Sequence, residues 1–244
     1  MNVYLIDGTF ELFRAYFSAP SRQSSTGVEV GASLGLLRNT ASLLRDPDVR
    51  HVACAFDHVI ESFRNDMFAG YKTGEGIEPE LYGQFPIAER VMAALGVCTW
   101  PMVEFEADDA IATAAVKLAD HPEVDKVIIA SPDKDLMQVV TGDKIVCWDR
   151  IRDKLYDEPG VIEKFGVSPD SLPDYLGLVG DTADGIPGVP KWGAKSTATL
   201  LAHYSTLENI PEDHTSWEVK VRGAAGLSEN LNGMREEAAL FKKL

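Results

Sequence analysis

Nine acidic residues in this 244-residue chain have the spacing expected of one carboxylate cluster. They are Asp7, Asp57, Glu106, Asp108, Asp109, Asp133, Asp135, Asp181 and Asp184. Carboxylates that gather in one place repel one another, so they stay ionised at low cost only when cations lie among them. Oxygen ligands suit hard cations such as Mg²⁺ or Mn²⁺. Two such ions about 3.5–4 Å apart can activate a water molecule and stabilise the leaving oxygen of a phosphodiester, and we predict that chemistry here.

Short apolar runs along the chain explain how these acids would meet. The runs cover residues 2–6, 51–56, 96–100, 126–130 and 144–148, and helical patterns lie near 30–45, 85–95 and 107–119. This alternation predicts an α/β fold with a mostly parallel sheet and helices on both faces. Functional residues in such folds lie at the carboxyl ends of the strands.

Each group of acids stands at such a position or in a tight loop. Asp7 and Asp57 end predicted strands, and residues 106–109 begin a predicted helix. Residues 133–135 follow a strand, and residues 181–184 lie among glycines and prolines. Any single group has an ordinary explanation, since helix dipoles favour acids in the first turn and Asp is common in loops. All the groups together favour a functional site.

The chain changes character along its length. Residues 60–83 are polar and Gly-rich without clear periodicity, which indicates a functional or flexible loop. From about residue 158, short helical pieces replace the alternating pattern, and Gly and Pro crowd residues 180–193 between two helical stretches. We therefore expect a catalytic core over residues 1–157 with a loop or arch at 60–83, and a helical part over 158–244 that contains a helix–loop–helix at 172–203.

Composition limits the class of protein. With 45% hydrophobic and 25% charged residues, the chain is typical of a soluble globular protein. It has neither a signal-peptide pattern nor a run of about 20 apolar residues, which predicts a cytoplasmic protein outside the membrane. Three cysteines without a close pair argue against a disulfide framework or a zinc site. Their apolar surroundings predict that Cys54, Cys98 and Cys147 are buried.

The formal net charge of −15 argues against a nucleic-acid-binding protein. Without the nine acids, however, 29 acids stand against 23 bases, and the balance falls to −6. Bound cations would partly neutralise the cluster itself. We therefore expect nucleic acid to be held through the metal ions and a few basic side chains, with a modest dependence on salt.

Several segments, taken in order, resemble a known family. They are LIDGTFELFRAYF, FDHVIESFRNDMFAGYK, FEADDAIATAA, IIASPDKDLMQ and LPDYLGLVGDTADGIPGVPKWGAKSTATLL. Together they resemble the 5′-nuclease domain of bacterial DNA polymerase I and its stand-alone flap-endonuclease and 5′–3′ exonuclease relatives, over nearly the whole chain. The resemblance implies a PIN-like core with a helix–three-turn–helix DNA-binding element and a C-terminal helical part.

The resemblance also implies where cations bind. The acids matching the family's first metal site are Asp7, Asp57, Glu106 and Asp108. Those matching the second are Asp133, Asp135, Asp181 and Asp184. Asp109 belongs to the same motif, without an assigned role. In the family, backbone carbonyls of the helix–three-turn–helix bind K⁺, and the matching positions are Leu178, Val179, Pro187, Val189 and Trp192.

Five further residues match or adjoin positions that contact DNA in the family. Lys72 matches the catalytic lysine at the scissile phosphate. Arg64 either binds phosphate or pairs with a local acid, and Tyr71 either stacks on a base or supports the loop. Lys195 matches a lysine that would grip duplex phosphates, and Lys191 adds a candidate contact beside it.

One departure from the family pattern concerns the loop at 60–83. Glu75 stands where relatives commonly carry an arginine, and Glu78 and Glu80 follow it. This acidic loop puts a basic, threading arch in doubt. It leaves three interpretations of the chain: a structure-selective 5′-nuclease, a DNA-junction binding protein with little catalysis, and a PIN-type ribonuclease.

The first interpretation is favoured, because a pure binding protein has no need of nine costly acids and PIN-type ribonucleases lack the GDTADGIPGVP hairpin. It implies a monomer that acts on a 5′-flap or a single-strand/duplex junction in replication or repair. A DNA polymerase and a ligase would be its functional partners.

Overall fold

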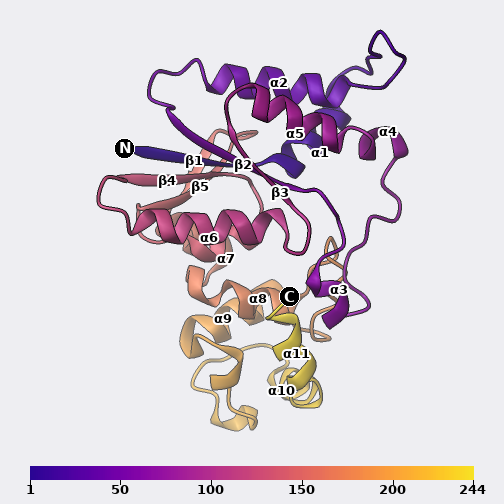
Figure 1. Ribbon diagram of the computed structural model, residues 1–244. Coiled ribbons are helices and arrows are strands. Elements are labelled where there is room, and N and C mark those ends of the chain that lie inside the picture. Colours follow the sequence, from indigo (N-terminus) through magenta and orange to yellow (C-terminus); the bar gives the residue numbers. More distant parts are fainter.

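The computed structural model describes all 244 residues. Its centre is a six-stranded sheet with the strand order β3-β2-β1-β4-β5-β6 (Figure 1). The strands are β1 (Asn2–Asp7), β2 (His51–Asp57), β3 (Cys98–Met102), β4 (Lys126–Ala130), β5 (Ile145–Asp149) and β6 (Lys154–Tyr156). All neighbours are parallel except β5 and β6. The predicted α/β fold with a mostly parallel sheet is confirmed.

Helices cover both faces of this sheet (Figure 1). One face carries α1 (Gly8–Ser18), α2 (Gly31–Leu43) and α5 (Phe85–Ala94), and the other carries α6 (Ala107–Ala119) and α7 (Glu158–Phe165). In β1, Leu5 belongs to the buried cluster under α6, whereas Ile6 belongs to the cluster under α1. Successive side chains of a strand point to opposite faces, so a strand covered on both sides is apolar throughout.

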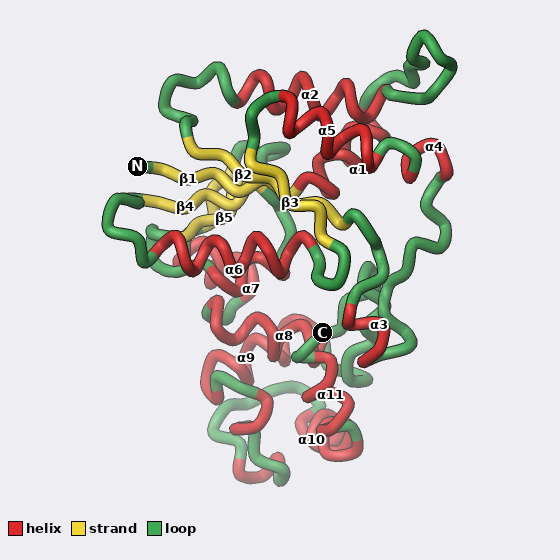
Figure 2. The backbone as a smooth tube through the Cα atoms, viewed as in Figure 1, coloured by secondary structure: helices red, strands yellow, loops and turns green.

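The C-terminal part is a group of helices that packs against one end of the core (Figure 2). It comprises α8 (Leu172–Val179), α9 (Ala194–Tyr204), α10 (Ala224–Gly233) and α11 (Arg235–Phe241), with 3-10 turns at Pro169–Ser171, Leu207–Asn209 and His214–Ser216. Leu178, Leu200 and Leu231 join the same buried cluster as Leu5 of the sheet. The two parts therefore share one core. No helix combines the length and apolar character needed to cross a bilayer.

Two details differ from the sequence-based expectations. The strand β6 lies outside every predicted run, because three residues carry too little periodicity to be recognised. Cys54 and Cys147 are buried as predicted, but Cys98 is exposed. The reason is that β3 is an edge strand, so its apolar pattern does not guarantee cover on both sides.

The segment over residues 60–83 is anchored to the helical part (Figure 2). It contains the short helix α3 (Phe63–Met67) and leads into α4 (Pro79–Tyr82). Tyr71 packs with Ile186 and Phe241 in a small buried cluster. The backbone N–H of Lys72 donates to the carbonyl of Asp184 at 3.0 Å. The middle of the predicted loop is therefore held against the turn that connects α8 to α9.

That connecting turn depends on glycine. Asp181 and Ile186 exchange two backbone hydrogen bonds, of 2.8 and 2.7 Å, which close a tight turn around Asp184. Gly185 has a φ of +77°, and a Cβ there would lie 2.1 Å from the carbonyl oxygen of Gly70. Only a residue without a side chain permits both this backbone conformation and this close approach.

We therefore expect Gly185→Ala to lower the thermal stability. The clash and the left-handed backbone together should cost about 2–4 kcal/mol, a fall in Tm of roughly 4–16 °C for a chain of this size. The matched control is Gly76→Ala, since Gly76 has a φ of +88° but a Cβ at that position would meet no other atom within 4 Å. Equal Tm values for the two variants would show that the contact with Gly70 is not tight.

Candidate active site

Strand ends and helix starts hold the first acids in place. Asp7 ends β1 and caps α1, because its Oδ1 accepts from the N–H of Phe10 at 2.8 Å. Its Oδ2 accepts from the hydroxyl of Ser131, just after β4, at 3.0 Å. Asp57 ends β2 and accepts from the N–H of Ala107 at 2.7 Å, which ties that strand to α6. The carboxyl edge of the sheet thus gathers acids from neighbouring strands, as predicted.

Two groups of carboxylates come close enough to share cations. One group contains Asp108, Asp133 and Asp135, and the other contains Asp135, Asp181 and Asp184. Within each group the candidate ligand oxygens all lie within 4.8 Å of one another. Asp135 begins the 3-10 helix η1 (Asp135–Val139) and belongs to both groups. The acids from the sheet edge and from the connecting turn therefore meet at one residue.

The electrostatics of these groups fit divalent cations. Burial raises the pKa of Asp7 to about 7, and the charges of Asp57 and Asp133 add to the effect. Burial likewise raises the pKa of Asp108 and Asp135 well above the usual range, and neighbouring carboxylates increase both shifts. One oxygen of Asp135 is buried and has no hydrogen-bond partner. A buried carboxylate oxygen without a donor, surrounded by like charges, is the environment that a cation relieves.

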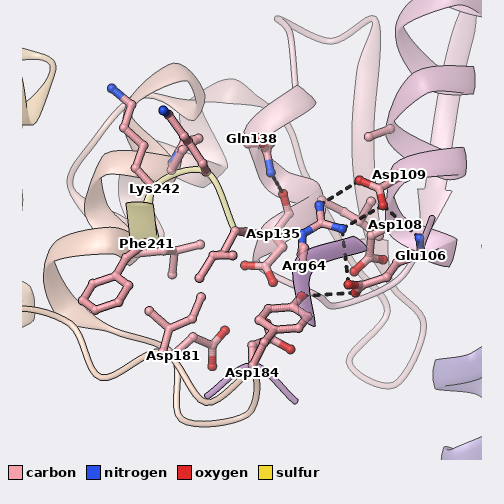
Figure 3. Close-up of a pocket in the computed structure, with 18 residues that line it drawn as sticks. Arg64, Glu106, Asp108, Asp109, Asp135, Gln138, Asp181, Asp184, Phe241 and Lys242 are labelled. Carbon is pink, nitrogen blue, oxygen red and sulfur yellow. Dashed lines mark hydrogen bonds and ion pairs between the residues drawn. The ribbon is translucent and has the colours of Figure 1, made fainter. Parts of the chain in front are cut away.

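Glu106 and Asp109 are held by protein donors (Figure 3). Arg64 forms a two-pronged ion pair with Asp109, with both distances at 2.8 Å, and reaches Glu106 at 3.2 Å. Glu106 also accepts from the hydroxyl of Ser62 at 2.6 Å and from the hydroxyl of Tyr71 at 3.2 Å. Glu106 and Asp109 form the capping box of α6. This network fixes the start of α6, and with it Asp108.

Arg64 and Tyr71 therefore have partners inside the protein. Arg64 is bound to two acids and to the carbonyl of Leu244, and the ring of Tyr71 is buried. Of the two roles weighed for each residue, the geometry supports pairing with local acids for Arg64 and support of the loop for Tyr71. The sequence did not reveal Ser62 as part of this network, since a lone serine in a polar segment carries no signal.

Lys72 lies between the two sets of acids. Its Nζ is 2.9 Å from Glu106 and 2.9 Å from Asp184. Burial alone would lower the pKa of Lys72, but Asp184 and Glu106 outweigh burial and raise it. The ammonium group is therefore charged throughout the accessible pH range. Its side chain is only partly enclosed, since 30% of it is exposed.

Lys134 is a site residue that the sequence patterns did not indicate. It stands between Asp133 and Asp135, and its Nζ pairs with Asp181 of the connecting turn. Burial tends to raise the pKa of Asp181, but the hydrogen bond from Lys134 lowers it overall. The only signal for Lys134 in the sequence is its place inside the SPDKD segment.

The remaining candidates lie around the connecting turn. Lys191 and Lys195 are exposed, and Lys195 is in the first turn of α9. Trp192 is buried, donates to the carbonyl of Leu227 at 3.0 Å, and meets Trp217 edge to face. Trp192 therefore packs inside the helical part. Among the five carbonyl positions expected for K⁺, the carbonyl of Leu178 already accepts the N–H of Val189 at 2.8 Å.

The cavity between these groups measures about 180 Å³ (Figure 3). Its lining includes Arg64, Tyr71 and Glu106, the acids Asp108, Asp109, Asp135, Asp181 and Asp184, and Phe241 and Lys242 of the C-terminal segment. An acidic cavity of this kind, at the carboxyl edge of a parallel sheet, can hold metal ions and polarise a phosphodiester.

The raised pKa values of the buried acids predict that the stability of the metal-free protein depends on pH. Asp7 binds its proton more tightly in the folded state, with a pKa of about 7, than in the unfolded chain, where about 3.9 is usual. Folded stability should therefore fall as pH rises from about 4 to about 7, and the raised pKa values of Asp108 and Asp135 act in the same direction. Asp109 and Asp181, whose pKa values are lowered, contribute their changes only below this window.

The measurement is Tm in EDTA across this range. A loss of about 2 kcal/mol corresponds to a fall of roughly 4–8 °C for a chain of this size. Mg²⁺ should reverse the loss at high pH, and Asp7→Asn, which can still cap α1, should flatten the slope. A Tm that rises from pH 5 to pH 7 in EDTA would contradict the raised pKa values.

Family comparisons agree with the fold. A model of the N-terminal resolvase-like domain of 5′-3′ exonucleases matches residues 2–166, and a model of their C-terminal SAM fold matches residues 167–244. The chain therefore belongs to the 5′-3′ exonuclease family, and the resemblance drawn from the sequence is confirmed.

Two individual relatives are similar to this chain over most of its length. The chain is 34% identical over 218 residues to a 5′-3′ exonuclease of Aquifex aeolicus, which covers 89% of this chain and 73% of that protein. It is 35% identical over 228 residues to DNA polymerase I of Mycobacterium leprae, which covers 91% of this chain and 24% of the polymerase. The chain thus spans about a quarter of that polymerase's length.

A solved structure shares the fold. It is the bacteriophage T5 flap endonuclease, described as a pseudo-enzyme–product complex with DNA and metal ions. The TM-score is 0.75 with 22% identity, over 99% of this chain and 88% of that chain. At this level of identity, the comparison supports the architecture of the core and the helical part together.

Proposed function

We propose that this protein is a structure-selective 5′-nuclease that hydrolyses DNA phosphodiesters near a single-strand/duplex junction with two Mg²⁺ or Mn²⁺ ions. The observation that carries the proposal is Asp135, whose carboxylate is shared by two acidic groups and has an unpartnered buried oxygen. The family assignment and the T5 complex with DNA and metal ions support it. When bound, such ions lower the pKa of a water molecule and stabilise a leaving oxygen.

The chain's own residues have distinct tasks in this proposal. Asp108, Asp133 and Asp135 would hold one ion, and Asp135, Asp181 and Asp184 the other. Asp7 and Asp57 keep the strand ends and helix starts together and add negative charge around the first group. The ion pair of Arg64 with Asp109 keeps α6 in register, so Asp108 stays directed at its neighbours.

Lys72 is placed to receive the scissile phosphate. An ammonium group has three N–H donors, and Glu106 and Asp184 engage two of them. One donor remains for a phosphate oxygen. Because the site is enclosed and acidic, this positive charge counteracts the repulsion between the carboxylates and the substrate.

The helical part would hold the duplex. Lys191 and Lys195 are exposed beside the N-terminal end of α9, where free backbone N–H groups also favour phosphate. We include in the proposal a K⁺ ion bound by backbone carbonyls of the connecting turn. Cleavage at a junction would leave gaps or nicks, so a DNA polymerase and a ligase would act on the products, and we place this monomeric protein in the cytoplasm.

The direct test is cleavage of a labelled 5′-flap duplex with Mg²⁺ or Mn²⁺, compared with a matched RNA flap. Release of products with 5′-phosphates, abolished by EDTA, is the expected result. Binding that survives EDTA with no cleavage by either ion would instead identify a junction-binding protein. Preferred cleavage of the RNA flap would identify a ribonuclease.

The charge of the loop at 60–83 leads to a separate prediction about the length of the flap. Its five acids are exposed, whereas its two bases, Arg64 and Lys72, are both paired with acids inside the site. A long single-stranded flap would therefore meet mainly exposed acids along this loop. We expect Glu75→Arg to raise kcat/KM on a long 5′-flap by about 2- to 10-fold at low salt, because it removes repulsion and adds attraction.

The control substrate for this variant is a nicked duplex without a flap, which does not reach the loop. Its kcat/KM should stay the same in Glu75→Arg and in the wild type. An equal gain on both substrates would assign the effect to general DNA attraction, and no gain on the long flap would contradict the prediction.

A further inference from the structure

The two acidic groups differ in how their charge is balanced. In the group of Asp135, Asp181 and Asp184, two of the three carboxylates already have lysine partners. Asp184 pairs with Lys72, and Asp181 pairs with Lys134. In the group of Asp108, Asp133 and Asp135, no basic side chain lies within ion-pair distance of any member. A divalent cation that enters the Asp135–Asp181–Asp184 group must therefore compete with ammonium charges. The Asp108–Asp133–Asp135 group has no such charges.

The two lysines are not held equally. Lys72 is fixed between Glu106 and Asp184, and its backbone N–H is bonded to the carbonyl of Asp184. Lys134 has a single acidic partner, Asp181, and 32% of its side chain is exposed. On its outer side it borders a surface groove that Phe10, Lys164 and Phe165 also line. Lys134 is therefore the lysine that can leave the acidic group without breaking a second contact.

Both oxygens of Asp181 accept a hydrogen bond while this pair is made. Its Oδ2 is bound by Lys134, and its Oδ1 accepts from the N–H of Ala183 at 3.0 Å. The ammonium group on Oδ2 repels a divalent cation that approaches this carboxylate, whereas the neutral N–H on Oδ1 carries no net charge. The backbone N–H belongs to the tight turn around Asp184, so the ammonium group is the one that gives way.

We propose that Lys134 acts as a resident cation in the Asp135–Asp181–Asp184 group, where it competes with the second divalent ion and sets the affinity for it. This inference rests on the proposed two-metal function and concerns how that site is regulated. Lys134 lowers the affinity for the second ion and balances the negative charge of Asp181 until that ion binds. The unequal balance predicts that ions bind in sequence, first beside Asp108 and then beside Asp181.

The test is Mn²⁺ binding to the full chain without DNA, by calorimetry, for the wild type and three variants. Lys134→Met should tighten the second binding event about tenfold or more and leave the first unchanged, because the competing charge is gone. Lys134→Arg keeps the charge and should restore weak second binding. Lys164→Met is the matched control, since Lys164 lines the same groove but pairs with no acid of either group.

A second measurement guards against a general effect on folding. In EDTA, Lys134→Met should have a lower Tm than the wild type, because Asp181 loses its partner, and saturating Mn²⁺ should remove the difference. An unchanged or weaker second binding event in Lys134→Met would overturn the role of Lys134 while leaving the proposed function intact. Failure of the wild type and of every variant to bind a second ion would overturn both.

Discussion

Asp135→Asn should abolish nuclease activity and at the same time stabilise the metal-free protein. Asp135 is the one carboxylate that both acidic groups share, so its loss weakens the binding of both ions. If each ion contributes several kcal/mol to the transition state, a loss of about 4 kcal/mol corresponds to roughly a thousandfold fall in kcat/KM. We expect a decrease of at least that size with Mg²⁺ on a 5′-flap.

The rise in stability follows from the same residue. Burial and the charges of Asp133 and Asp184 raise the pKa of Asp135, so its ionised form is unfavourable in the folded protein without metal. An amide of the same shape removes that cost. A gain of about 1–2 kcal/mol would raise Tm in EDTA by roughly 2–8 °C. Adding Mg²⁺ should raise Tm further in the wild type and much less in the variant.

Asp143→Asn is the matched control, because the side chain of Asp143 is 90% exposed and belongs to neither acidic group. It should change neither activity nor the effect of Mg²⁺ on Tm. An Asp135→Asn protein that retains more than about a tenth of wild-type activity would show that the two groups do not share their ligand. A lower Tm of this variant in EDTA would show that the ionised carboxylate of Asp135 does not destabilise the metal-free protein.

The fold and the acids could be predicted from the sequence because both leave periodic or positional signals. Strands covered on both faces, such as β1, form continuous apolar runs, and the acids at their ends mark the functional edge of the sheet. The resemblance to the family then assigned Lys72. The resemblance also divided the acids into two metal sets, with Asp108 in the set of Asp7, Asp57 and Glu106, whereas the structure brings Asp108 together with Asp133 and Asp135.

The pairings that escaped prediction join residues distant in sequence. Arg64 and Asp109 are 45 positions apart, and Lys134 and Asp181 are 47 apart. Neither pair follows from local spacing, because the first depends on how α3 docks beside α6 and the second on how the connecting turn meets the sheet. Net charge was likewise a poor guide to the class of protein. Much of the acidity belongs to one site, and the nearby basic side chains are paired with acids there.

The second large effect is expected for Lys72→Ala, which should lower kcat on a 5′-flap by about 10²- to 10³-fold, the range found when one preorganised donor to a developing charge is removed. Two of its N–H donors are engaged by Glu106 and Asp184, and no other lysine contacts both of these acids. Because those two carboxylates also lose their shared partner, Tm in EDTA should fall as well.

Lys72→Arg separates the contribution of Lys72 to catalysis from its contribution to stability. Its guanidinium keeps the charge, so stability should largely return, but its longer planar head cannot occupy the same point between Glu106 and Asp184, so activity should recover only in part. Lys117→Ala, on the exposed end of α6, is the control for loss of one positive charge. If Lys72→Ala cleaves at the wild-type rate while binding DNA normally, the phosphate is met by the metal ions alone, and Lys72 serves only to balance the acids around it.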